Sequence, residues 1–231
     1  MSIPPRIRRE RSAARSGSRP WGGPPHGPPA LLRLPLESGG AWCGTVAALR
    51  WGVAGHTVPP RLEVPLQTDE LCQLLGAIRR QYRLSWTGIH GVGHWARVLE
   101  TGLRLASVTG ADPEVVTLFA LFHDACRRND NHDPRHGVRG AELAAAILGP
   151  HFAGRPRQLE LLLEACTHHT EGRTDAEVTV ATCWDADRLD LLRVGIMPSP
   201  HRLCTDAARD PALLAWANDR AVRDVEFVDN A

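Results

Sequence analysis

The sequence contains no lysine, and all 27 of its basic residues are arginine. We read this bias first as genomic base composition and only secondarily as function. The arginines nearly balance the 26 acidic residues, and the formal net charge is +1. Because there is no global field of either sign, the composition gives no strong argument for a nucleic-acid or a membrane partner.

Paired cysteines and long apolar segments are also lacking. None of the six cysteines forms a Cys-x-x-Cys pair, and four of them lie in apolar helical patterns. This predicts reduced thiols in a cytoplasmic protein rather than a disulfide framework. No stretch is long and apolar enough to span a membrane. The 231 residues, 43% hydrophobic and 23% charged, predict a globular protein with one good core or a domain plus an extension.

The first part of the chain differs in composition from the rest. Residues 1–35 hold eight of the 18 prolines and seven arginines against one glutamate. Such a segment cannot bury enough apolar surface to form a core. We expect residues 1–66 to be a disordered or loosely structured N-terminal extension and residues 67–231 to form the domain. A flexible tail, a transit peptide and a start codon assigned too early all fit this composition, so whether residues 1–65 belong to the cellular protein is left open.

Hydrophobic periodicity predicts an all-α domain. Apolar residues recur at helical spacing from Thr68 onward, and no β pattern follows. Asp112-Pro113-Glu114 is typical of a helix start, and the run after it is apolar nearly all round, as in a central helix. We expect a bundle of about seven or eight helices. Beyond the helix that starts at residue 68, they lie near residues 94–108, 113–122, 136–148, 157–169, 178–194, 202–209 and 211–223.

The chemistry of the chain centres on residues 118–126, where an apolar run ends in adjacent His123 and Asp124. Burying two titratable groups there costs several kcal/mol unless something pairs them, and a divalent metal would do so. A lone His-Asp pair is more often a surface turn or a helix end. However, eight of the eleven histidines lie between positions 90 and 169. Imidazole and carboxylate together suit Zn, Mn, Fe or Co.

A metal held between helices would make hydroxide available at neutral pH, and two metals about 4 Å apart would also clamp a phosphate oxygen. Arginine suits phosphate because its planar fork binds two oxygens at once. Arg97 follows His94 by one helical turn, and Arg127 follows the His-Asp pair. Both are candidates for a phosphate contact. For each of the 27 arginines, a solvated surface residue is the alternative interpretation.

Three local motifs together resemble the HD superfamily of metal-dependent phosphohydrolases. They are His94-x-x-Arg97-Val98, Leu121-Phe122-His123-Asp124 and Ala186-Asp187-Arg188-Leu189-Asp190. The resemblance covers about residues 86–195. It implies an HD-domain helical bundle and hydrolysis of phosphomonoesters, phosphodiesters or nucleoside triphosphates. The divalent metal that it also implies is bound by His94, His123, Asp124 and Asp187.

Further histidines look like the additional positions of two-metal HD members. His136, His168 and His169 are therefore candidates for binding a second metal or the substrate phosphate. The Gly-Tyr-Pro element of the HD-GYP cyclic-dinucleotide phosphodiesterases is absent, and Ala125-Cys126-Arg127 replaces the Gly-Lys that follows the His-Asp pair in that family. The run of residues 185–190 looks closer to small bacterial HD hydrolases of unassigned substrate.

Three further acidic and histidine residues lie beside these candidates in the sequence. Asp187 is preferred to Asp185 as the ligand because the family aspartate usually follows a small residue within the helix. Asp190 is expected to support Arg188 or a helix cap. His90 precedes the first motif. It could donate a hydrogen bond to a metal ligand or contact the substrate, and both roles are left open.

The sequence therefore predicts a cytoplasmic phosphohydrolase with one or two divalent metals, Mn, Fe, Zn, Co or Mg. It would act on a nucleotide or another small phosphate ester, with no membrane partner, and a homo-oligomer is left open. An HD-type di-iron oxygenase is the alternative enzyme, and a non-catalytic module that senses a nucleotide or a metal is the alternative without catalysis. The residues expected to take part in catalysis are Asp124, His136, His168, Arg97 and Arg127.

Overall fold

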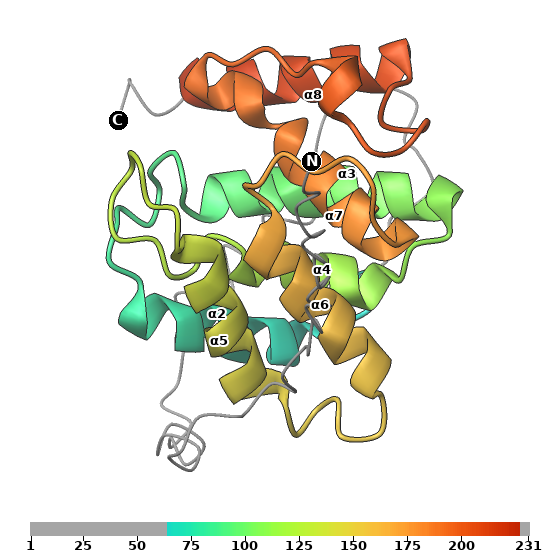
Figure 1. The fold of residues 1–231 in the computed structure, drawn as a ribbon. Helices are drawn as coiled ribbons and strands as arrows, with labels where there is room; N and C mark the ends of the chain where they lie inside the picture. The colour runs from blue at the N-terminus through green and yellow to red at the C-terminus, as the bar shows by residue number, and fades with distance from the viewer. Residues whose placement is uncertain (1–63, 227–231) are drawn as a thin grey trace, which may run out of the picture.

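The structure, a computed structural model, describes residues 64–226. The expectation of a loosely structured extension over residues 1–66 therefore lies almost wholly outside the described residues. Within residues 64–226 the regular structure consists of seven α-helices and two 3-10 helices, without a strand (Figure 1). The all-α prediction is confirmed, while the domain boundary at residue 67 stays a prediction.

Helix α4, Pro113–Phe122, is the central element, and the sequence dictates both its start and its burial. The Asp112 carboxylate accepts hydrogen bonds from the main-chain N–H groups of Glu114 (2.9 Å) and Val115 (3.2 Å), which satisfies the free donors of the first turn. Every residue from Val115 to Phe122 is buried. The helix thus places the residues that follow it, His123 and Asp124, inside the bundle.

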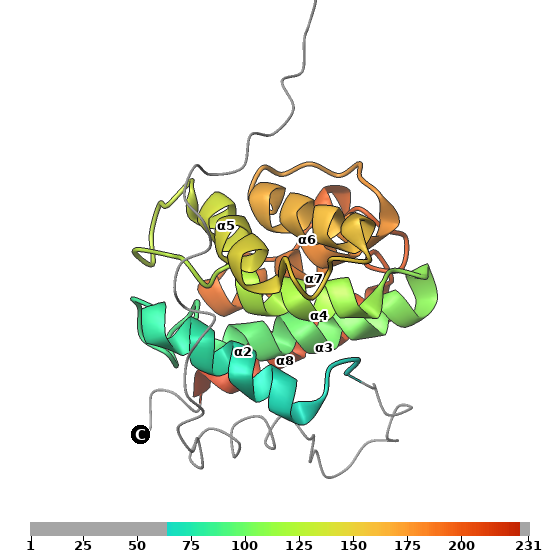
Figure 2. The ribbon, with the colours of Figure 1, turned by 90° about the horizontal axis from the view of Figure 1, so that it is seen from below.

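The other helices enclose α4. Figure 2 shows α5 and α6 on one side of α4, with α2 and α3 on the other. Helix α7 packs against α3, α4 and α6, so several helices come together around α4. The bounds of these helices are α2 Thr68–Gln81, α3 Val92–Thr109, α5 His136–Leu148, α6 Pro156–His168 and α7 Val178–Arg188.

The C-terminal part of the described chain lies across one end of the bundle (Figure 1). It comprises the 3-10 helices η2 (Leu191–Val194) and η3 (Pro200–Arg202) and helix α8 (Pro211–Glu226). Arg220 of α8 forms an ion pair with the buried Glu100 of α3 at 2.9 Å. A small separate core fixes the segment further, made of Leu105, Leu189, Leu203, Ala208 and Ala217.

Two predicted helices are wrong. The single helix expected over residues 178–194 ends at Arg188, and a turn separates it from η2. The helix expected over residues 202–209 does not form, and turns and bends take its place over residues 204–209. The Asp185 carboxylate accepts hydrogen bonds from the main-chain N–H groups of Cys204 (2.7 Å) and Thr205 (2.8 Å), which ties this segment to the end of α7.

In the part of the chain that the structure describes, no helix combines the length and the apolar character needed to cross a membrane.

Candidate metal centre

Three different parts of the bundle contribute to a first group of side chains, which we call the first cluster. His94 lies in the first turn of α3, His123 and Asp124 directly follow α4, and Asp187 lies in the last turn of α7. His94 and His123 are almost completely buried, at 1% and 0% exposure. Polar side chains at this depth need partners, because each one has lost its contact with water.

The potential ligand atoms of the first cluster converge on one point. The Nε2 atom of His94 lies 3.0 Å from Nε2 of His123, 3.3 Å from Oδ1 of Asp187 and 3.8 Å from Oδ2 of Asp124. The Nε2 atom of His123 lies 3.8 Å from Oδ1 of Asp187 and 3.9 Å from Oδ2 of Asp124. Atoms bound at about 2.1 Å to one ion are spaced in this way, so the four residues could share a metal.

A second cluster adjoins the first through Asp124. The Oδ1 atom of Asp124 lies 3.1 Å from Nε2 of His136, at the start of α5, and 3.8 Å from Nε2 of His169, directly after α6. The two Nε2 atoms are 2.9 Å apart. The two carboxylate oxygens of Asp124 thus face two different pairs of histidines, and the arrangement could hold one metal or two.

The hydrogen bonds at the far side of each imidazole show which nitrogen is free. Nδ1 of His94 donates to the Asp190 carboxylate at 2.7 Å. In the other three rings Nδ1 donates to a main-chain carbonyl: Phe119 for His123 (3.1 Å), Asp133 for His136 (2.5 Å) and Cys166 for His169 (2.8 Å). In the neutral rings each Nε2 therefore carries a lone pair. In each cluster two Nε2 atoms lie 2.9–3.0 Å apart. Two lone pairs at this distance repel each other, whereas a cation between them could bind both.

The electrostatics of the site favour a bound cation. Burial lowers the pKa of His123 to about 3, so its imidazole is neutral, the form that binds a metal. Burial would raise the pKa of Asp124, but the neighbouring His123 and hydrogen bonds with His136, His169 and His90 hold it well below its usual range. Burial also lowers the pKa of His169, yet its hydrogen bond to Asp124 and the nearby carboxylate charges raise it overall. Carboxylates that stay ionised at this depth, as Asp124 and Asp187 do, attract a metal cation.

Two residues outside the clusters hold the ligands in place. Asp190 accepts hydrogen bonds from His94 and from Nε of Arg97, the latter at 2.7 Å. His90 lies 2.9 Å, through its Nδ1, from Oδ2 of Asp124. The expectation that Asp190 supports Arg188 is wrong, because Arg188 instead donates to the main-chain carbonyl of Arg202 at 2.8 Å. The sequence contains one indication that Asp190 lies near the site, because it follows Asp187 by about one helical turn.

We expect Asp190→Asn to weaken metal binding at the first cluster about 10- to 100-fold, because residues that orient a metal-binding histidine typically contribute that much. The amide would lose the charge that Arg97 and His94 share. Equilibrium dialysis against Mn²⁺ measures the change. Asp219→Asn is the matched control, since Asp219 is exposed and pairs with Arg223 at the surface. Equal metal affinity in the two variants would contradict the role of Asp190.

The structure separates the other sequence-predicted residues. It brings Arg127 to the second cluster, 3.2 Å from Nε2 of His136. Arg97 bonds Asp190 through two of its nitrogens, and its contact with a phosphate stays a prediction. His168 is half-buried at the end of α6 and bonds Glu171 at 2.7 Å, so it is not brought to the second cluster.

Asp185 and Asp187 face in different directions from α7. Asp187 reaches His94 and His123, as described above. Asp185 is fully buried and bonds the segment that contains Cys204 and Thr205. Of these two aspartates, Asp187 lies with the potential metal ligands and Asp185 does not.

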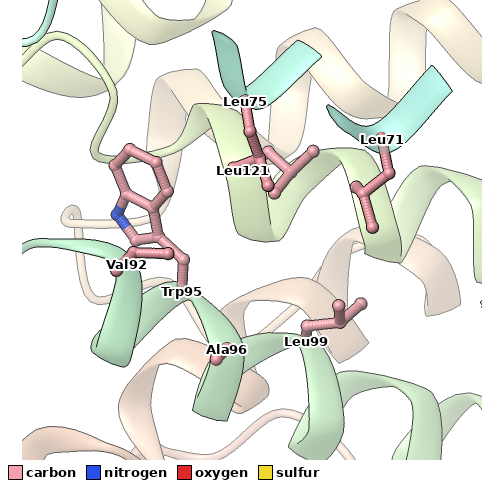
Figure 3. Close-up of a pocket in the computed structure, with 7 residues that line it drawn as sticks. All are labelled: Leu71, Leu75, Val92, Trp95, Ala96, Leu99 and Leu121. Carbon is pink, nitrogen blue, oxygen red and sulfur yellow. The ribbon is translucent and has the colours of Figure 1, made fainter. Parts of the chain in front are cut away.

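An apolar hollow lies away from both clusters, between α2, α3 and α4. Its volume is about 10 Å³. Figure 3 shows its seven lining residues, which include Leu71, Trp95 and Leu121 and none of the clustered histidines or aspartates. A gap of this size and polarity is a packing defect too small and too apolar to hold an ordered water.

Comparison with known proteins finds a family match over the segment that carries this histidine- and aspartate-lined site. Residues 91–200 match the family model described as the HD domain. Over 134 residues the chain is 28% identical to the symmetrical bis(5'-nucleosyl)-tetraphosphatase of Halalkalibacterium halodurans, an alignment that covers 52% of this chain and 71% of the relative. A crystal structure of a predicted HD superfamily hydrolase from an uncultured Thermotogales bacterium is 27% identical, with a TM-score of 0.49, and covers 69% of this chain and 89% of that one.

An all-α bundle with two pairs of buried histidines around a shared aspartate defines a candidate metal-binding protein. The family match is more specific: residues 91–200, which carry both clusters, match the HD domain. HD domains are metal-dependent, and the clusters provide residues that could bind the metal.

Proposed function

We propose that the protein is a metal-dependent phosphohydrolase whose substrate is a nucleotide with a chain of phosphates. Asp124 carries the proposal, because its two oxygens face two pairs of converging imidazole nitrogens. Such a site suits phosphate ester hydrolysis, in which a bound water attacks phosphorus and the developing negative charge needs stabilisation.

The tetraphosphatase relative supports a specific substrate class. We propose a dinucleoside tetraphosphate, cleaved by water at the central bridging oxygen to give two nucleoside diphosphates. Mononucleotides and other small phosphate esters are the substrates to compare.

The ligand atoms available in the two clusters limit which metal ions suit the site. In the first cluster His94, His123, Asp124 and Asp187 would coordinate one ion. In the second cluster Asp124 and two further histidines would coordinate the other, so that the Asp124 carboxylate is shared. Mn, Fe, Zn and Co suit such mixed nitrogen and oxygen ligands, whereas Mg strongly prefers oxygen. A metal bound there would supply a water whose pKa is lowered to near 7.

The surrounding residues have separate tasks in this proposal. Asp190 keeps the His94 ring oriented through Nδ1, and His90 holds Oδ2 of Asp124. Arg97 neutralises Asp190 and acts as a positioning residue. Arg127 is the guanidinium closest to the shared carboxylate, at 3.4 Å from its Oδ1 atom, and can contribute positive charge toward a phosphate.

The test is hydrolysis of diadenosine tetraphosphate by the purified full-length chain, followed by chromatography of the products. We expect ADP as the product with Mn²⁺ or Fe²⁺, loss of activity after chelation and recovery when metal is added back. AMP, ADP, ATP and a chromogenic phosphate ester form the comparison panel. Metal binding without turnover of any of these substrates would contradict the proposed hydrolase and favour a sensing module, and oxygen consumption by the iron-loaded protein would favour the oxygenase.

A further inference from the structure

Arg127 occupies an unusual place for a guanidinium. Its Nη1 atom lies 3.4 Å from Oδ1 of Asp124 and 3.2 Å from Nε2 of His136. These are two of the three atoms that form the second cluster, the third being Nε2 of His169. The side chain is nearly buried, with 10% exposure. A fixed positive charge of this chain therefore already lies against the atoms that a second metal would use.

The loop after α4 holds the guanidinium in that place. Nη2 of Arg127 donates to the main-chain carbonyl of Asn131 at 2.9 Å, and Nε donates to that of Asn129 at 3.4 Å. The same loop is tied down through Asp133, whose carboxylate accepts the main-chain N–H of Arg128 at 2.9 Å and also bonds Arg139. The main-chain carbonyl of Asp133 in turn fixes Nδ1 of His136. The loop thus positions both the guanidinium and one potential ligand.

A second metal and Arg127 cannot use His136 independently. The Nε2 lone pair of His136 can accept an Arg127 hydrogen bond or bind an ion, but not both. An ion about 2.1 Å from His136 would have Nη1 of Arg127, in its present position, no more than about 5 Å away. Like charges this close in a buried site repel with little screening, so a second ion must displace the guanidinium or bind weakly beside it.

We propose that Arg127 is an internal cation that competes with the second metal and sets its affinity. The inference rests on the proposed metal-dependent function, which supplies the two clusters. With one ion bound, Arg127 neutralises Oδ1 of Asp124 and satisfies His136. When a second ion enters, the guanidinium has to give up its contacts with Oδ1 of Asp124 and Nε2 of His136, and its Nη1 group is then free for a phosphate. The first cluster is therefore the tight site and the second is the exchangeable one.

The test counts Mn²⁺ ions rather than turnover. Metal-free protein is dialysed against a series of free Mn²⁺ concentrations, the bound ions are counted by mass spectrometry, and electron paramagnetic resonance distinguishes a single ion from a coupled pair. In Arg127→Gln we expect the second ion to bind at a free concentration at least tenfold lower than in the wild type, with the first ion's affinity changed less than threefold. Combining Arg127→Gln with His169→Ala should remove the second ion and the coupled signal.

Matched variants keep the result specific. Arg128→Gln removes the same charge from the next residue, an exposed one, and should leave both affinities unchanged. Arg127→Lys keeps a charge and should shift the second affinity less than Arg127→Gln. Unchanged or weaker second-ion binding in Arg127→Gln would overturn the inference, and so would an equal gain in Arg128→Gln or in Arg127→Lys. Retained binding of the first ion in Arg127→Gln shows that the fold is intact. Loss of both ions would show that Arg127 stabilises the site rather than competing with the second ion, and would also overturn the inference.

The two proposals fail separately. Metal-binding curves as expected but no hydrolysis would contradict only the proposed activity. Hydrolysis together with unchanged curves in Arg127→Gln would contradict only the competition between Arg127 and the second metal.

Discussion

Asp124→Asn is expected to lower kcat/KM about a thousandfold or more, which corresponds to about 4 kcal/mol of transition-state stabilisation. Asp124 is the residue whose two oxygens face both histidine pairs. An amide of the same size has one oxygen and one NH₂ group, so a nitrogen that donates must face one of the clusters. It would oppose imidazole nitrogens at the place where a metal is needed, and the variant is expected to lose at least one ion and most of its affinity for the other.

Metal content and hydrolysis are measured together for this variant. Asp185→Asn is the matched control because Asp185 is also a fully buried aspartate of the bundle, but its bonds go to Cys204 and Thr205. We expect Asp185→Asn to lower thermal stability and to keep its metal. If Asp124→Asn kept full metal content and activity, the shared carboxylate would not be the centre of the site and the proposed function would be wrong.

Gly140→Ala is expected to lower the free energy of unfolding by about 2–3 kcal/mol. A Cβ atom at Gly140 would lie 2.3 Å from the main-chain oxygen of Phe122 and 3.1 Å from that of His123. These carbonyls belong to the end of the central helix and cannot rotate away as a side chain would. Alanine favours a helix over glycine by about 1 kcal/mol, so the loss has to come from packing.

The substitution should also affect the second cluster. Helix α5 must move away from α4 to admit the methyl group, and His136 at its start moves with it. Differential scanning calorimetry should show a melting temperature lower by about 5–10 °C, and dialysis should show weaker binding of a second ion. Gly154→Ala is the control, because a Cβ there meets nothing within 4 Å. Equal melting temperatures in the two variants would contradict the close approach of α5 to α4.

The elements that the sequence predicts well are those with local causes. Helix α4 begins where the Asp112-Pro113 signal places it and is buried throughout its apolar run. Helix α3 ends at Gly110, whose left-handed φ of 78° suits glycine. Periodicity likewise located most of the other helices to within a few residues. In each case the information lies within one helix or in the residue beside it.

The errors have nonlocal causes. Residues 202–209 have an amphipathic pattern, but their donors bond to Asp185, about 20 residues away in the sequence. Residues 178–194 read as one helix, but the chain turns after Arg188, and Asp190 there reaches His94, 96 residues away in the sequence. Hydrophobic periodicity contains no information about such distant partners.

For the site, the sequence by itself determined that His123 and Asp124 lie together at the end of a buried helix, because they are covalent neighbours after an apolar run. It also supplied the set of histidines and aspartates from which the ligands come. Only the tertiary structure decided which of them meet. His168 and His169 are adjacent and chemically identical, yet consecutive residues at the end of a helix point about 100° apart, and only His169 faces Asp124. The packing of α5 and α6 against α4 fixes that direction, and it also brings Arg127 to the atoms of the second cluster.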